Sequence, residues 1–103
     1  ASLDLIVSSF LLHELPATLR DRAFAEISRV MKPGGLVVIV DSLQKGDRPE
    51  WDGLLDLFPH YFHEPYYAEY VEGSTENWCA AARLTPVQSE CAFLSKVVAA
   101  TRA

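Results

Sequence analysis

The clearest indication of the fold is the stretch Arg29–Ser42, RVMKPGGLVVIVDS. Its second half, Leu36–Val40, is apolar and rich in β-branched residues, which is typical of a strand buried on both faces of a parallel sheet. Pro33 cannot continue a helix, and Gly34 or Gly35 can adopt the positive φ that a helix end or a tight turn requires. We therefore expect a helix to end at Pro33 and a central strand to follow.

The residues before this stretch predict a strand and a helix. Leu3–Phe10 is apolar without alternation and should be a buried parallel strand that ends near Ser9 or Phe10. Pro16 suits the first turn of a helix that runs to Pro33. Its apolar stripe comprises Leu19, Ala23, Phe24, Ile27, Val30 and Met31. Its polar side comprises Arg20, Asp21, Arg22, Glu26 and Arg29, with Arg22 and Glu26 spaced to pair. Two parallel strands joined by a helix form a right-handed βαβ unit.

The second half of the chain predicts three helices. A polar loop, 44–47, ends at Asp47, which can cap a helix that begins at Arg48 and is closed by Pro59. The apolar face of this helix comprises Trp51, Leu54, Leu55 and Phe58. Pro65 opens a short helix that Gly73 ends, and Ser74 or Thr75 caps a third helix that carries Trp78, Cys79 and Ala82.

The chain then ends in two predicted strands. Val87–Phe93 and Lys96–Thr101 are separated by a short turn and should form an antiparallel hairpin.

Composition limits the classes of function. The 103 residues fit one domain, in which 50% of the residues are hydrophobic and 22% are charged. The net charge of −5 argues against a nucleic-acid partner, and the longest apolar run is too short to span a bilayer. Two cysteines in a core-forming domain are expected to be reduced, so we expect a cytoplasmic protein. A chain that starts Ala-Ser is compatible with a removed initiator Met or with a cut from a longer protein.

These elements and motifs resemble the later part of class I S-adenosylmethionine-dependent methyltransferases. Residues 4–7 resemble the fourth strand of that family, and Leu12-His13-Glu14-Leu15 resembles the turn that follows it. Residues 29–35 resemble its arginine-valine-leucine-lysine-proline-glycine-glycine signature, and 96–100 its closing strand. The resemblance implies an α/β fold, a truncated Rossmann-like sheet of about four strands, two parallel plus a C-terminal hairpin. We expect 1–103 to be a single partial domain that lacks the N-terminal cofactor-binding strands.

The resemblance also implies a cofactor, S-adenosylmethionine, and limits how this chain could hold it. The family binds its cofactor with a glycine-rich loop after the first strand and an acidic residue at the end of the second. Neither is found in this sequence, because Gly34-Gly35 precedes a strand instead of following one. At most, Ser8, Ser9 and Phe10 would form one wall of the cofactor site. It is therefore open from the sequence whether this chain binds the cofactor on its own.

Candidate acceptor-site residues follow from the same resemblance. His13 would be a catalytic base or a substrate contact, or it could merely cap or pack in its turn. Asp41 could bind substrate, or it could hydrogen-bond the loop that follows it. His60 and Tyr61 fall in a region that often forms the substrate lid of the family.

The sequence does not predict a metal site. His60 and His63 are three residues apart with Glu64 adjacent, and these are metal-ligating residue types. The order is not that of the zincin motif, however, and Pro59 and Pro65 make a helix doubtful there.

Two functions remain open from the sequence. The chain could be a piece of a methyltransferase that needs its N-terminal half, from the same or another polypeptide, to act. Alternatively it could be a non-catalytic remnant that self-associates. In that case we expect a twofold homodimer through the edge of strand 3–10, an uncovered sheet face, or both.

Overall fold

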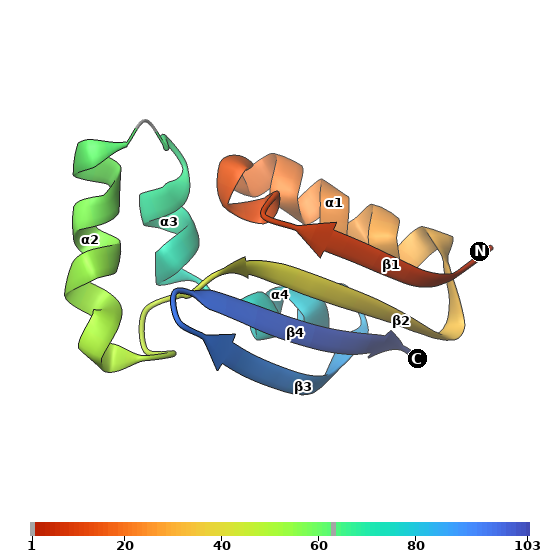
Figure 1. Cartoon of the computed structure of the whole chain (residues 1–103). Coiled ribbons are helices and arrows are strands. Elements are labelled where there is room, and N and C mark those ends of the chain that lie inside the picture. Colours follow the sequence, from red (N-terminus) through yellow and green to blue (C-terminus); the bar gives the residue numbers. More distant parts are fainter. Residues whose placement is uncertain (1, 63) are drawn as a thin grey trace.

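The computed structural model describes residues 2–62 and 64–103, which form a four-stranded mixed sheet with helices (Figure 1). β1 (Leu3–Ser9) pairs in parallel with β2 (Met31–Ser42). β3 (Leu84–Ala92) and β4 (Ser95–Arg102) form the hairpin, and β4 lies antiparallel between β2 and β3. The sheet order β1-β2-β4-β3 confirms the predicted fold class, two parallel strands plus a C-terminal hairpin.

The helices occupy two places around this sheet (Figure 1). α1 (Ala17–Val30) and α4 (Thr75–Ala81) cover one face. α2 (Asp52–Tyr61) and α3 (Tyr67–Glu72) lie beyond the end at which β1 and β2 finish. Two single 3₁₀ turns, Leu12–Glu14 and Pro49–Trp51, precede α1 and α2. Among the described residues, no helix combines the length and the apolarity that crossing a lipid bilayer requires.

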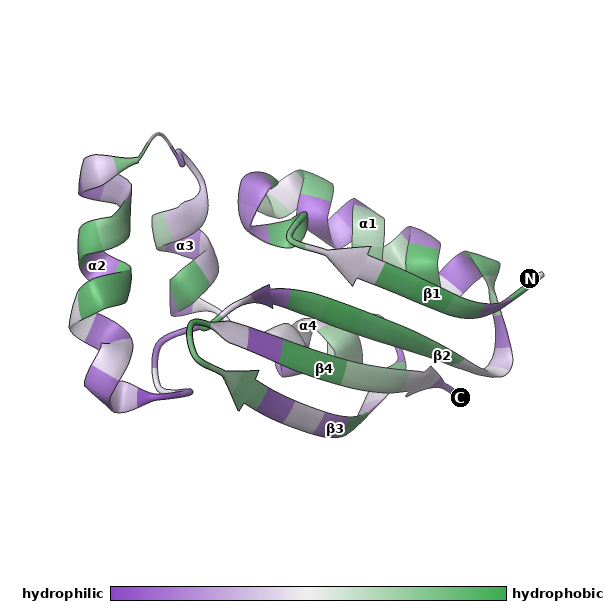
Figure 2. Ribbon diagram, in the orientation of Figure 1, coloured by the Kyte–Doolittle hydropathy of each residue, from purple (hydrophilic) through white to green (hydrophobic). Residues whose placement is uncertain are grey.

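The opposite face of the sheet is open. The molecule measures 41 × 24 × 19 Å, and 19 Å accommodates two layers of secondary structure. On the open face β1 contributes Leu5 and Val7, whose exposed fractions are 57% and 61%. Beside them in register lie Leu36, Val38 and Val40 of β2, then Val97 and Ala99 of β4. Figure 2 shows the hydrophobic segments of these three strands in green.

The core lies between the sheet and the helices. Alternate residues of the central strands, among them Val37, Ile39, Val98 and Ala100, point toward α1 and α4 and are fully buried. Phe24 of α1, Tyr70 of α3 and Cys79 of α4 complete the core from the helical side. The sheet is therefore buried on one face only.

The two cysteines are free, as expected, but they differ in burial, and this predicts unequal reactivity. Cys79 is buried, and burial raises the pKa of its thiol to about 11, whereas Cys91 is exposed on β3. We expect a disulfide exchange reagent at pH 8 to modify one thiol rapidly in the folded chain and both in denaturant. Cys79→Ser should leave the rapid phase unchanged. Two rapid thiols in the folded chain would contradict the burial of Cys79.

The polar side of α1 differs from the prediction at Arg20. This side chain is 2% exposed, with both terminal nitrogens donating to Glu69, and its guanidinium lies 3.9 Å from the centre of the Trp78 ring. A planar guanidinium can stack on an aromatic ring while it pairs with a carboxylate, so it can be buried where other cations cannot. Leu19, predicted on the apolar stripe, is exposed instead, and Arg29 pairs with Glu26.

Several predicted boundaries also shift. The first helix ends at Val30, and β2 begins at Met31 and passes through Pro33-Gly34-Gly35, with Gly34 at φ +81°. Pro59 does not close α2 but lies inside it, in the last turn, where it removes one i→i−4 hydrogen bond. β3 starts three residues earlier than predicted, at Leu84.

Asp47 does not cap α2. Its carboxylate accepts a hydrogen bond from the Gln44 backbone N–H at 2.8 Å and lies 2.9 Å from the Lys96 ammonium. Arg48 occupies the position before the 3₁₀ turn and makes no capping hydrogen bond there. Ser74, by contrast, caps α4 as predicted, because its hydroxyl accepts from the Asn77 N–H.

A strained residue links α4 to β3. Arg83 is exposed and has φ +64°, a left-handed conformation that costs a non-glycine residue roughly 1 kcal/mol. Arg83→Gly should therefore raise the free energy of unfolding by about 1 kcal/mol, measured by urea denaturation. Arg83→Ala, which keeps a Cβ, is the matched control and should not stabilise the chain. A loss of stability in Arg83→Gly would show that the arginine side chain is itself needed.

Candidate functional site

The site is built where β1 and β2 end. His13 lies in the 3₁₀ turn that follows β1, and Asp41 is the penultimate residue of β2. Because parallel strands run in the same direction, their carboxyl ends meet at one edge of the sheet. This topology places His13 Nδ1 2.6 Å from Asp41 Oδ1, although the two residues are 28 positions apart.

The Asp41 carboxylate is fixed by three groups. Besides the His13 ring, the Leu12 N–H donates to Oδ2 and the Ser42 N–H donates to Oδ1, each at 2.8 Å. Asp41 is 1% exposed and Leu12, which anchors the turn, is also 1% exposed. An ionised carboxylate can only accept, so this contact assigns a proton to His13 Nδ1, and in the neutral imidazole the lone pair is then on the other ring nitrogen, Nε2.

A small cavity of about 240 Å³ lies beside this pair. It is lined by Phe10, His13, Ser42, Phe58, Tyr67, Leu94 and Ser95. The Tyr67 hydroxyl and the Ser42 Oγ are 2.6 Å apart, and burial raises the pKa of Tyr67, so its phenol stays neutral at physiological pH. The cavity therefore presents aromatic surface together with an imidazole and hydroxyl groups.

Phe10, which lines the cavity, has an unusual backbone conformation. Its φ is +52°, and its N–H donates to the Val40 carbonyl at 2.7 Å. Positive φ in a bulky residue is uncommon and often accompanies functional sites. Here it ends β1 abruptly and places an aromatic ring, 48% exposed, at the carboxyl end of the sheet.

The structure brings together only some of the residues proposed from the sequence. His13, Asp41 and Phe10 lie at the same edge, whereas His60 and Tyr61 are exposed at the end of α2 and do not line this cavity. Ser9 is exposed on β1. Glu64 is described, but His63 lies outside the described residues.

Ser8 points toward the helical side of the sheet. It is half-buried, and among the described residues its Oγ has no hydrogen-bond partner. Its hydroxyl is therefore a polar group that the described fold itself does not satisfy.

Five lining residues were missed from the sequence: Ser42, Phe58, Tyr67, Leu94 and Ser95. Leu94 lies in the β3–β4 turn and Ser95 is the first residue of β4, so both reach the site only because β4 lies beside β2. Tyr67 was assigned to a helix, but no sequence signal placed that helix over the end of β2.

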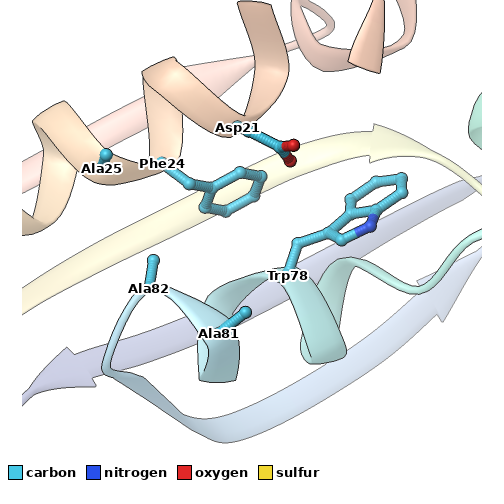
Figure 3. A pocket seen from close by; sticks show the side chains of 6 residues that line it. All are labelled: Asp21, Phe24, Ala25, Trp78, Ala81 and Ala82. Atoms are coloured by element: carbon cyan, nitrogen blue, oxygen red, sulfur yellow. The ribbon is translucent and has the colours of Figure 1, made fainter. Parts of the chain in front are cut away.

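A second, open groove of about 300 Å³ lies between α1 and α4 (Figure 3). Its lining comprises Asp21, Phe24, Ala25, Trp78, Ala81 and Ala82. Phe24 and Trp78 face each other across it, with ring centres 6.3 Å apart. Asp21 is the only polar side chain among these lining residues apart from the Trp78 indole, so the groove offers mainly packing surface.

Comparisons with known proteins agree with the fold. Residues 1–39 match a family described as methyltransferase domain. No match was found among curated proteins. Among solved structures, the chain is similar to an O-methyltransferase family 2 protein from Planctomyces limnophilus bound to apigenin, with 20% identity and a TM-score of 0.68. It is also similar to an O-methyltransferase family protein from Burkholderia thailandensis, with 15% identity and a TM-score of 0.71.

A third similar structure contains a cofactor product. It is the 1,6-didemethyltoxoflavin-N1-methyltransferase from Burkholderia thailandensis with S-adenosylhomocysteine, with 16% identity and a TM-score of 0.63 over 97% of this chain and 44% of that one. The chain is covered to 100% and 99% by the first two structures but spans only 31% of each. Its fold is therefore part of the class I S-adenosylmethionine-dependent methyltransferase fold.

Proposed function

We propose that the chain supplies the acceptor side of a methyltransferase site, with His13 as the group that receives a proton from the methyl acceptor. The observation that supports this is the His13–Asp41 pair at the carboxyl ends of β1 and β2. Open α/β sheets bind their ligands at that edge. The cavity beside the pair provides a place for the acceptor.

The described residues do not by themselves fit the cofactor. S-adenosylmethionine supplies the methyl group in this class of reaction, and it needs a glycine cradle and an acidic partner. Gly34 and Gly35 lie in the irregular first part of β2, between the paired residues Met31 and Leu36 and at the end of the sheet opposite His13, so they cannot serve as that cradle. Ser8, Ser9 and Phe10 offer one wall. We therefore propose that most of the cofactor is held by residues that these 103 do not include.

The proposed role of His13 follows from its two ring nitrogens. Asp41 accepts the Nδ1–H, which leaves the Nε2 lone pair to take a proton from a hydroxyl or amine of the acceptor. The imidazolium that results is stabilised by the adjacent carboxylate. Asp41 is then a positioning residue, because it acts through the imidazole and does not touch the acceptor.

His13→Gln in the full-length gene product tests this role. General-base catalysis contributes about 10²–10⁴-fold, so kcat should fall by that factor while the dissociation constant of S-adenosylhomocysteine stays the same. Asp21→Asn, in the groove between α1 and α4, is the control and should leave kcat unchanged. An unchanged kcat in His13→Gln would refute the proposal.

Calorimetry on the 103-residue chain tests whether residues outside this chain are needed to bind the cofactor. If the cofactor depends on residues outside this chain, titration with S-adenosylmethionine should give no saturable heat at micromolar concentrations. Micromolar binding would refute the proposal that other residues hold most of the cofactor, because it would show that the chain forms a complete cofactor site.

A second candidate function is self-association. It is favoured by the open sheet face and by the edge position of β1, which no other strand pairs on its outer side among the described residues. Unpaired strand edges and contiguous apolar patches commonly form interfaces, and twofold dimers are the commonest closed assembly.

Sedimentation equilibrium separates this candidate from the first. A dimer through the open face should dissociate in Val7→Lys, because a buried ammonium would have no partner there. Leu57→Lys is the matched control, since Leu57 is 50% exposed on α2, away from that face. A monodisperse monomer at all concentrations would exclude the homodimer.

A further inference from the structure

Three potential metal ligands converge at the outer side of the His13 ring. One ligand atom each from His13, Glu14 and Glu64 lies within 4.8 Å of the others. The Nε2 of His13 is 3.9 Å from Glu64 Oε2, which is too long for a hydrogen bond. The cluster therefore brings two carboxylates close to an imidazole nitrogen without a direct bond between them.

The inner side of the ring adds an independent observation. Metal-binding histidines almost always donate their second ring N–H to a carboxylate or carbonyl, which fixes the ring and directs the free lone pair at the ion. His13 makes this contact with Asp41 at 2.6 Å, and Asp41 is itself held by the Leu12 and Ser42 N–H groups. Asp41 lies in β2, whereas the three ligands lie in the turn after β1 and between α2 and α3, so Asp41 supports the ring from within the sheet.

The spacing and burial of these three ligands would allow a small cation to bind all three at once. Ligand atoms bound tetrahedrally to zinc are about 3.4 Å apart, given bonds of about 2.1 Å. The His13 ring is 13% exposed and Glu64 is 24% exposed, so the pair lies at a partly desolvated boundary. The Glu14 side chain is exposed, and ligand atoms up to 4.8 Å apart would have to approach by at most about 1.4 Å to reach the zinc spacing.

We propose that His13, Glu14 and Glu64 bind one divalent ion of the zinc type. One imidazole and two carboxylates favour Zn²⁺ over Mg²⁺, which prefers oxygen ligands alone. The ion occupies the same Nε2 lone pair that would take a proton from the acceptor, so metal binding blocks that role. This inhibitory consequence rests on the proposed function, whereas the metal site itself does not.

Metal titration of the 103-residue chain tests the site directly. Calorimetry should show that one Zn²⁺ ion binds per chain, and Co²⁺ bound in its place should give the visible absorption of a tetrahedral site. His13→Gln should abolish both signals, and Glu64→Gln should weaken binding at least tenfold. Asp41→Asn should weaken it about 10–100-fold through the ring, with circular dichroism confirming that each variant folds. Because Glu64 lies at the surface, its variant keeps the test valid if Asp41→Asn does not fold.

Control variants exclude other donors. His60→Gln and His63→Gln remove the remaining histidines, and Cys91→Ser removes the exposed thiol. Each should retain one ion per chain. Binding that survives His13→Gln, or that one of these three variants abolishes, would overturn the proposed site. Zn²⁺ binding at His13 without loss of methyl transfer would leave the metal site standing and refute His13 as the proton acceptor.

Discussion

Lys96→Met should lower the free energy of unfolding by about 3 kcal/mol. Among the described ion pairs, Lys96 is the only cation that contacts the carboxylates of Asp47 and Glu76, and the substitution removes it from this buried cluster. The Lys96 side chain is 3% exposed. Its ammonium lies 2.9 Å from Asp47, 3.0 Å from Glu76 and 2.9 Å from the Gln44 side-chain oxygen. Methionine fills the same volume but leaves two carboxylates facing an apolar side chain.

The size of this effect depends on burial. Breaking a fully buried pair costs about 3–5 kcal/mol, and here the carboxylates are 20% and 29% exposed, so we expect the lower end of that range. Urea denaturation measures it. Lys45→Met is the matched control, since Lys45 contacts Asp56 and Glu72, which are both 62% exposed, and surface pairs contribute little. Equal losses in the two variants would contradict a special role for Lys96.

The same cluster makes stability depend on pH. Burial alone would raise the pKa of Glu76, but the hydrogen bond from Lys96 and the backbone outweigh it, and the net pKa is lowered. A lowered pKa means that this stabilisation is fully present above the unfolded value, about 4.3, and is lost as the pH falls through the folded value. The free energy of unfolding should therefore fall less steeply from pH 6 to pH 3 in Glu76→Gln than in the unmodified chain, as measured by urea denaturation. Parallel curves would argue against the contribution of Glu76.

How much of the fold the sequence reveals depends on how local each cause is. β2 and α1 were predictable because apolar runs, helical periodicity and the helix-breaking sequence Pro33-Gly34-Gly35 act within about ten residues. The burial of Arg20 was not, because it depends on Trp78 and Glu69, roughly fifty positions away. A charged residue on a helix reads as exposed unless its distant partners are known.

The candidate site divides in the same way. His13 and Asp41 were identified from motifs at the ends of two strands that any parallel pairing brings together. The Ser42–Tyr67 contact and the contribution of Ser95 depend on how α3 and the β3–β4 turn pack at the end of the sheet. No short sequence pattern encodes that packing. The residues that line the cavity therefore could not be predicted from the sequence, whereas His13 and Asp41 could.

Gly73→Ala should destabilise the chain by about 2–3 kcal/mol, the cost of overpacking a filled site. A Cβ at position 73 would lie 2.2 Å from Cζ2 of the Trp78 ring. The ring cannot move aside easily, because the Arg20 guanidinium covers it and Tyr70 packs at 5.4 Å between ring centres. The φ of Gly73 is −93°, which alanine adopts freely, so the whole effect is steric.

Gly53→Ala is the matched control for this prediction. Gly53 lies in α2 with nothing within 4 Å of a Cβ, so alanine there should stabilise the helix by about 0.5–1 kcal/mol. Urea denaturation of both variants, and of Gly73→Ala combined with Trp78→Leu, gives the coupling between the two positions. The smaller side chain should recover much of the loss, because it removes the atoms that clash. Additive losses in the double variant would mean that Trp78 is not the obstacle and that position 73 needs glycine for another reason.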